Sequence, residues 1–218
     1  MSELNVINPL IFKAHQRLVF IGDSITDANR TGADAPFGNG YVSMVRAFLI
    51  ARYPELNLTV INKGVGGNTV RHLAQRWERD VIAERPHWLA VMIGINDVWR
   101  HFTSTPGEAV PIDEYQRVLR GLLQRAREAT RANLILLTPY MIEPTKSNPM
   151  RQLMDVYGRV VDLIGREFGA VMVRTQDAWD RVLASTPPTF WSQDKIHPTP
   201  AGHAVIANAL LNAVNFRL

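Results

Sequence analysis

The sequence predicts an α/β layer fold with a mainly parallel sheet. Short runs rich in β-branched residues alternate with amphipathic segments along the chain, a pattern typical of strands joined by crossover helices. The chain has 218 residues, of which 46% are hydrophobic. This length supports one well-buried core and is too short for two full domains. We therefore expect a single domain over residues 1–218.

Five segments are predicted as strands because each is a short apolar run. They are 18–21, 58–61, 88–93, 134–138 and 171–173. Five further segments carry apolar residues at helical spacing and are predicted as helices. They are 41–52, 69–84, 113–131, 150–168 and 201–214. No repeat, linker or low-complexity stretch interrupts this alternation.

Composition excludes several classes of function. Lysine plus arginine exceed aspartate plus glutamate by 24 to 20, and both signs interleave in 71–85 and 117–131. This pattern indicates solvated helix faces and no surface for nucleic acid. Cysteine is absent, which excludes disulfides, thiolate catalysis and cysteine-ligated zinc. His15, His72 and His101 lack acidic or histidine partners at helical ligand spacing. His87 follows Glu84 by three residues, but Pro86 between them should end the helix that would align the pair. We therefore expect no metal site.

The location of the protein follows from its apolar segments. The stretch 6–12 is broken by Asn8 and Pro9 and lacks a basic leader, so it does not resemble a secretory signal. No apolar run approaches membrane-spanning length. We expect a cytoplasmic protein with no membrane partner.

Two motifs at opposite ends of the chain point to acyl transfer. The hexapeptide GDSITD at 22–27 follows the first strand and delivers Ser24 to a tight turn. Near the other end, Asp194 and His197 are spaced three residues apart and Pro198 follows them. A serine, a histidine and an aspartate are the three groups of nucleophilic catalysis by a hydroxyl. Hydrolysis is therefore the leading hypothesis.

Two further motifs follow predicted strands and offer hydrogen-bond donors. NKGVGGN occupies 62–68 and GIND occupies 94–97. In open parallel sheets, ligands sit beyond the carboxyl ends of the strands, where neighbouring loops converge. Ser24, Gly67 and Asn96 follow the first three strands, so we expect them to share one crevice.

Each motif taken alone has a plainer interpretation. Ser24 is a good N-cap, Asp97 is a good helix cap or turn former, and residues 64–67 suit a simple turn. A dinucleotide loop fails because Thr69 stands where its third glycine is needed. The nucleophile elbow Gly-x-Ser-x-Gly is also absent, so the serine must be activated in a different turn. The joint occurrence of the motifs favours the catalytic interpretation.

Together the blocks GDS, the glycine turn, GxND and DxxHP resemble the SGNH, or GDSL-type, serine hydrolases over nearly the whole chain. Within that family the chain is most similar to bacterial intracellular acetylesterases that act on acetylated xylooligosaccharides, through segments such as MIGINDVWR at 92–100. The resemblance implies a three-layer αβα sandwich of flavodoxin-like type with a five-stranded sheet. It also implies a homo-oligomer that needs no cofactor.

The resemblance implies a role for each motif residue. Ser24 is the nucleophile, His197 the general base and Asp194 the group that orients the imidazole. The oxyanion is held by the backbone amides of Ser24 and Gly67 and by the side-chain amide of Asn96. Gly66 is the alternative to Gly67, since the two are adjacent.

The substrate is less well determined by the sequence. Trp99, Tyr140 and Trp191 lie near the motif loops and are candidates to stack on sugar rings, although core packing is the commoner role of a single aromatic residue. An acetylated sugar fits the resemblance best. A lysophospholipase or thioesterase acting on longer acyl chains is the enzymatic alternative, and a catalytically silent sugar-binding module is the alternative of another class.

Overall fold

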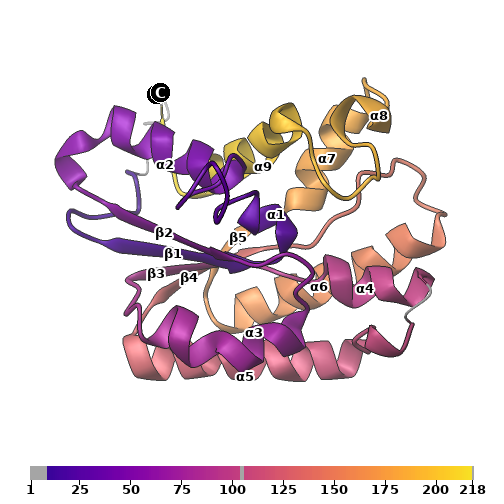
Figure 1. Ribbon diagram of the computed structural model, residues 1–218, viewed down its shortest axis with the longest axis horizontal. Helices are drawn as coiled ribbons and strands as arrows, with labels where there is room; N and C mark the ends of the chain where they lie inside the picture. Colours follow the sequence, from indigo (N-terminus) through magenta and orange to yellow (C-terminus); the bar gives the residue numbers. More distant parts are fainter. Residues whose placement is uncertain (1–8, 104–105, 218) are drawn as a thin grey trace, which may run out of the picture.

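A five-stranded sheet lies at the centre of the computed structural model, which describes residues 9–103 and 106–217 (Figure 1). All pairings are parallel, and the strand order is β2-β1-β3-β4-β5. The strands are β1 (Arg17–Gly22), β2 (Thr59–Gly64), β3 (Trp88–Met92), β4 (Asn133–Leu137) and β5 (Val171–Val173). This is the doubly wound, flavodoxin-like order, so the predicted fold class is confirmed.

Helices cover both faces of the sheet (Figure 1). One layer contains α2 (Tyr41–Arg52), α7 (Thr175–Leu183) and α9 (Pro200–Ala213). The other contains α3 (Val70–Trp77), α5 (Ile112–Thr130) and α6 (Pro149–Glu167). Short helices follow the carboxyl ends of β1 and β3 or precede the last helix, namely α1 (Ser24–Asp27), α4 (Ile95–Trp99) and α8 (Pro188–Trp191). With both faces covered, β1 and β3 are buried almost throughout, as their continuous apolar runs require.

The predicted elements agree with the structure to within a few residues, with three differences. The strand expected at 58–61 continues to Gly64, because the Asn62 side chain inside it is satisfied by donating to the carbonyls of Thr26 and Phe37. The helix expected at 69–84 is α-helical only to Trp77 and then π-helical over Glu78–Ile82. The third difference is that α7 and the short helices α1, α4 and α8 were not predicted.

Two expectations concern a secretory signal and membrane-spanning helices. Part of the segment considered as a secretory signal, residues 6–8, lies outside the described residues. Within 9–103 and 106–217, no helix is both long enough and apolar enough to cross a membrane.

Arg76 on α3 ties the carboxyl ends of two strands together. Its guanidinium donates to the carbonyl of Gly22 at the end of β1 (2.9 Å) and to that of Lys63 in β2 (2.7 Å). It also donates to the Asn68 side chain (2.8 Å) and pairs with Asp80 (2.9 Å). Burial lowers the pKa of Arg76 and its bond to Asp80 opposes this shift. One buried cation therefore aligns the loops that follow β1 and β2.

We expect Arg76→Met to lower the free energy of unfolding by about 3 kcal/mol or more, because the change leaves Asp80 and two carbonyls without their buried partner. Urea denaturation measures the loss. Arg79→Met is the matched control, since Arg79 bonds to the same Asp80 but its side chain is 76% exposed against 8% for Arg76. Equal effects of the two changes would contradict this account of Arg76.

Candidate active site

Ser24, His197 and Asp194 form a continuous chain of hydrogen bonds. Ser24 is the first residue of α1, directly after β1, and its Oγ lies 2.8 Å from His197 Nε2. His197 Nδ1 lies 2.6 Å from Asp194 Oδ2. An ionised carboxylate only accepts, so Nδ1 donates to Asp194 and Nε2 of the neutral imidazole accepts from the Ser24 hydroxyl. The structure thus brings together three residues from opposite ends of the chain.

Asp194 is held as an anion by the turn that carries it. Its Oδ1 accepts from the amides of Ile196 (2.9 Å) and His197 (2.8 Å) and from the Ser192 hydroxyl (3.0 Å). Burial acts to raise the pKa of Asp194, but the bonds from His197, Ile196 and Ser192 outweigh it and lower that pKa to about 2. The carboxylate is therefore charged at neutral pH, and it keeps the imidazole in one tautomer.

The glycine turn after β2 runs beside Ser24. A Cβ added to Gly66 would lie 4.0 Å from Ser24 Cβ. The Gly66 amide donates to Asp27 Oδ2 (3.1 Å), whereas the amides of Ser24 and Gly67 have no hydrogen-bond partner among the residues that the structure describes. Gly67 has φ of +74°, a conformation that favours glycine. This supports Gly67 over Gly66 as the donor of a free amide.

Asn96 presents a side-chain amide from α4, after β3. It is buried, and its Nδ2 donates to the Asn68 carbonyl (3.0 Å). The amide nitrogen carries two hydrogens, so one bond fixes its direction and the second hydrogen remains for a ligand. Ser24 and Asn96 thus flank the β1/β3 boundary, where the strand order reverses and ligands bind in doubly wound sheets.

Residues 20–205 match the GDSL-like Lipase/Acylhydrolase family. The chain belongs to this family. Family members are acyl hydrolases, and the arrangement of Ser24, His197 and Asp194 has the geometry of such chemistry.

Relatives within the family are similar over almost the whole chain. The acetylxylan esterase of Geobacillus stearothermophilus is 44% identical over 208 residues, which cover 92% of this chain and 94% of the relative. Its crystal structure superposes with a TM-score of 0.90 at 43% identity, covering 94% of this chain and 96% of that one. An alpha/beta hydrolase enzyme from the metagenome of Lake Arreo, Spain, has the same TM-score and identity and covers 94% and 98%.

Crystal structures of three catalytic mutants of the Geobacillus enzyme are also similar to this chain, each with a TM-score of 0.91. In these mutants a serine, an aspartate or a histidine is replaced by alanine. The same three residue types form the hydrogen-bonded chain at Ser24, Asp194 and His197.

The aromatic residues expected at the substrate surface differ in their surroundings. Trp99 is exposed, and Trp191 is half-buried with its indole nitrogen donating to Thr186. Tyr140 is only 1% exposed and its hydroxyl donates to the Ile196 carbonyl, so the expectation that its ring stacks on a sugar is wrong. Phe190 was not predicted as a surface residue from the sequence, and it is exposed on α8 before the Asp194 turn.

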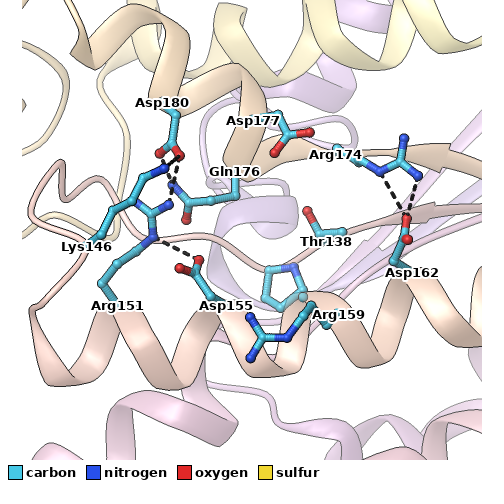
Figure 2. A pocket seen from close by; sticks show the side chains of 12 residues that line it. Thr138, Lys146, Arg151, Asp155, Arg159, Asp162, Arg174, Gln176, Asp177 and Asp180 are labelled. Atoms are coloured by element: carbon cyan, nitrogen blue, oxygen red, sulfur yellow. Dashed lines mark hydrogen bonds and ion pairs between the residues drawn. The ribbon is translucent and has the colours of Figure 1, made fainter.

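The structure has a recess next to the expected site residues and a pocket away from them. A recess of about 500 Å³ is lined by Thr69, Arg71 and Arg100, among others, and Arg100 donates to the Gly67 carbonyl (2.8 Å). The recess therefore opens beside the glycine turn that contains Gly67. A second pocket, of about 390 Å³, lies between α6 and α7 and contains none of the expected site residues (Figure 2).

Two buried carboxyls lie beneath the site. Asp23 caps α1 by accepting from the Ile25 amide, and Asp97 accepts from the Val70 amide at the start of α3. Asp97 lies inside α4 and caps neither helix, since Gly94 is the N-cap of α4 and Thr69 that of α3. Its bond to Val70 joins the two helices, so the interpretation of Asp97 as a helix cap or turn residue is wrong. Burial raises the pKa of both carboxyls to about 7. One oxygen of each, Oδ2, has no partner within the described part of the chain.

The raised pKa of Asp97 predicts a pH-dependent cost. The ordinary pKa of an aspartate is 3.8, and that of Asp97 in the native protein is about 7. Between these two pH values, the native Asp97 carboxyl keeps a proton that the unfolded chain releases. The free energy of unfolding therefore falls as pH rises through this window, and above it the cost of the buried charge is complete. Asp97→Asn keeps an oxygen for Val70 and removes this titration.

We expect the melting temperature of Asp97→Asn, relative to wild type, to rise by at least about 3 °C between pH 5 and pH 8. Calorimetry at several pH values measures this difference. Asp113→Asn, at an exposed carboxyl, is the control and shows no such trend. A difference for Asp97→Asn that stays constant with pH would show that the carboxyl does not titrate in this range.

Proposed function

We propose that the protein is a serine esterase that removes acetyl groups from acetylated xylooligosaccharides. The hydrogen-bonded chain from Ser24 through His197 to Asp194 carries this proposal. The relatives named as acetylxylan and acetyl-xylooligosaccharide esterases, at 43–44% identity, support the choice of substrate.

In the first step, Ser24 Oγ attacks the carbonyl carbon of the acetyl ester while His197 Nε2 takes the hydroxyl proton. Asp194 stabilises the imidazolium that forms. The backbone amides of Ser24 and Gly67 and the second hydrogen of Asn96 Nδ2 donate hydrogen bonds that stabilise the negative charge on the carbonyl oxygen. The tetrahedral intermediate then collapses, the sugar oxygen leaves with the proton from His197, and Ser24 is acetylated.

In the second step, water attacks the acetyl group on Ser24. His197 takes a proton from this water, and the same three donors hold the oxyanion. Collapse of the intermediate returns the proton to Ser24 Oγ and releases acetate. Each step uses only groups of this chain and water, so the proposal requires no metal or other cofactor.

The surroundings of Ser24 suit a hydrophilic leaving group. The recess beside Gly67 is lined by polar and charged side chains, including Arg71, His72 and Arg100. Hydroxyl groups of a sugar both donate and accept, so they can pair with such side chains, whereas a long acyl chain needs an apolar wall. We assign the sugar to the recess beside Gly67 and place the rest of the oligosaccharide toward the exposed ring of Trp99.

Two further properties rest on the resemblance and stay predictions. The copies of this chain assemble as a homo-oligomer, and the protein acts in the cytoplasm on a small acetylated sugar. Exposed apolar side chains such as Phe190, Leu163 and Phe48 are available for contacts between copies.

Acetate release from acetylated xylooligosaccharides, followed by mass spectrometry, tests the function. We expect wild type to release acetate and Ser24→Ala to lose at least about 1,000-fold of the turnover, since the acyl-enzyme no longer forms. Acetyl and octanoyl nitrophenyl esters compared side by side test the acyl group, and we expect the acetyl ester to be preferred. Preference for octanoyl would favour the lysophospholipase or thioesterase alternative. Absence of hydrolysis, with sugar affinity equal in wild type and Ser24→Ala, would favour the sugar-binding module.

A further inference from the structure

The turn that carries Asp194 and His197 contains a residue in an unusual conformation. Lys195 has φ of +64°, which is uncommon for a residue with a Cβ and persists only where its surroundings enforce it. Its carbonyl accepts from the Ile142 amide (2.9 Å), and its Nζ lies 2.6 Å from Glu143 Oε2. The segment after β4 therefore holds both the backbone and the side chain of Lys195.

Glu143 is a buried carboxylate that pairs with Lys195. Its side chain is only 6% exposed, whereas that of Lys195 is 45% exposed. Burial acts to raise the pKa of Glu143, but the bonds from Lys195 and from the Thr145 amide outweigh it and lower that pKa. A buried carboxylate is costly unless it is paired, and Lys195 is the cation that pairs with it.

Glu143 is itself fixed to two helices through Arg151. The buried Arg151 guanidinium donates to the Glu143 carbonyl (2.6 Å) and pairs with Asp155 on α6 and Asp180 on α7, each at 2.9 Å. Figure 2 shows the Arg151 side chain between these two carboxylates on the wall of the second pocket. The support of the Lys195 turn thus extends into the helical layers on both faces of the sheet.

The side of the turn that carries His197 and Asp194 faces solvent. The side chains of His197 and Asp194 are 47% and 49% exposed. On the inner side, Glu143 and Ile142 bind Lys195, and the Tyr140 hydroxyl donates to the Ile196 carbonyl. The ends of the turn are joined by the bond from the Thr199 amide to the Trp191 carbonyl (2.7 Å), which leaves the conformation at Lys195 to its own contacts. Rotation about the Lys195 backbone would swing His197 relative to Asp194 and Ser24.

We propose that Glu143 and Lys195 are positioning residues, whose ion pair locks the left-handed turn and thereby aims the His197 imidazole at Ser24. This inference rests on the proposed function. Neither residue takes part in the reaction steps derived above. A misplacement of about 1 Å in a reacting group costs up to about 100-fold in rate, so the pair acts on kcat.

The test compares two variants that break the pair from opposite sides. Lys195→Met removes the cation and keeps a long side chain, and Glu143→Gln removes the charge from a buried residue that cannot touch the substrate. We expect kcat for an acetyl ester to fall about 10- to 100-fold in each, with KM within about twofold of wild type. Lys195→Arg retains a cation of similar reach and is expected to restore most of the turnover.

Lys146→Met is the matched control. Lys146 lies near Glu143 in the chain and 4.0 Å from Asp180, but its side chain is 77% exposed. We expect its kcat to equal that of wild type. Because the pair acts as a unit, the double variant Glu143→Gln/Lys195→Met is expected to be no slower than the slower single variant.

A proton NMR signature separates positioning from stability. The hydrogen between His197 Nδ1 and Asp194 is expected to give a low-field resonance in wild type and Lys146→Met, and to broaden or move upfield in Lys195→Met. The variants are compared at a temperature where circular dichroism shows them folded. If Glu143→Gln does not fold, Lys195→Met and Lys195→Arg carry the test.

The inference is overturned if folded Lys195→Met keeps wild-type kcat, or if its low-field resonance is unchanged. It is also overturned if only KM changes, which would make Lys195 a substrate contact. Failure of the proposed function is a separate result. It would appear as no hydrolysis by wild type, as preference for the octanoyl ester or as full acetate release by Ser24→Ala, whereas the NMR signature requires no substrate.

Discussion

The hydrogen bond between Ser24 and His197 depends on the whole fold, because it joins residues 173 positions apart in the sequence. The serine comes from the end of β1, which lies between β2 and β3, and the histidine comes from the turn before the last helix. A parallel sheet directs the carboxyl ends of all its strands to one edge, so the first strand and the last loop can meet there. The site exists because this edge gathers four loops.

Buried polar side chains beneath the edge keep those loops in register. Arg76 links β1, β2 and the glycine turn that ends at Asn68, and Asn62 joins β2 to the turn that follows Ser24. Glu143 and Arg151 perform a comparable task under the Asp194 turn. The side chains of His197 and Asp194 are themselves about half exposed, so the edge that carries them is open to solvent. The loops are therefore held in place by the buried charged side chains beneath them, because a buried charge is costly to leave unpaired.

Local signals account for what the sequence predicted well. Each apolar run was long enough to mark a strand, and the residues after the first three strands were recognisable as motifs. Ser24, Asp194 and His197 could be expected together because their residue types suit one chemistry. The free amide of Gly67, in contrast, became distinguishable from Gly66 only through the bond from Gly66 to Asp27, which no sequence pattern indicates.

Long-range partners explain what the sequence missed. The sequence leaves Tyr140 open between sugar stacking and core packing, and the choice depends on its contact with Trp179 of α7, 39 residues further along the chain. The partnership of Lys195 with Glu143 spans 52 residues, and only a fold can specify it. The change from α- to π-helix after Trp77 likewise has no periodic signal.

The most direct test of the central claim is covalent labelling with a fluorophosphonate, followed by peptide mapping. The account predicts one adduct, on Ser24, and a labelling rate at least about 100-fold lower in His197→Ala, because the imidazole no longer takes the hydroxyl proton. An adduct on another residue, or labelling of Ser24 at the wild-type rate in His197→Ala, would contradict it.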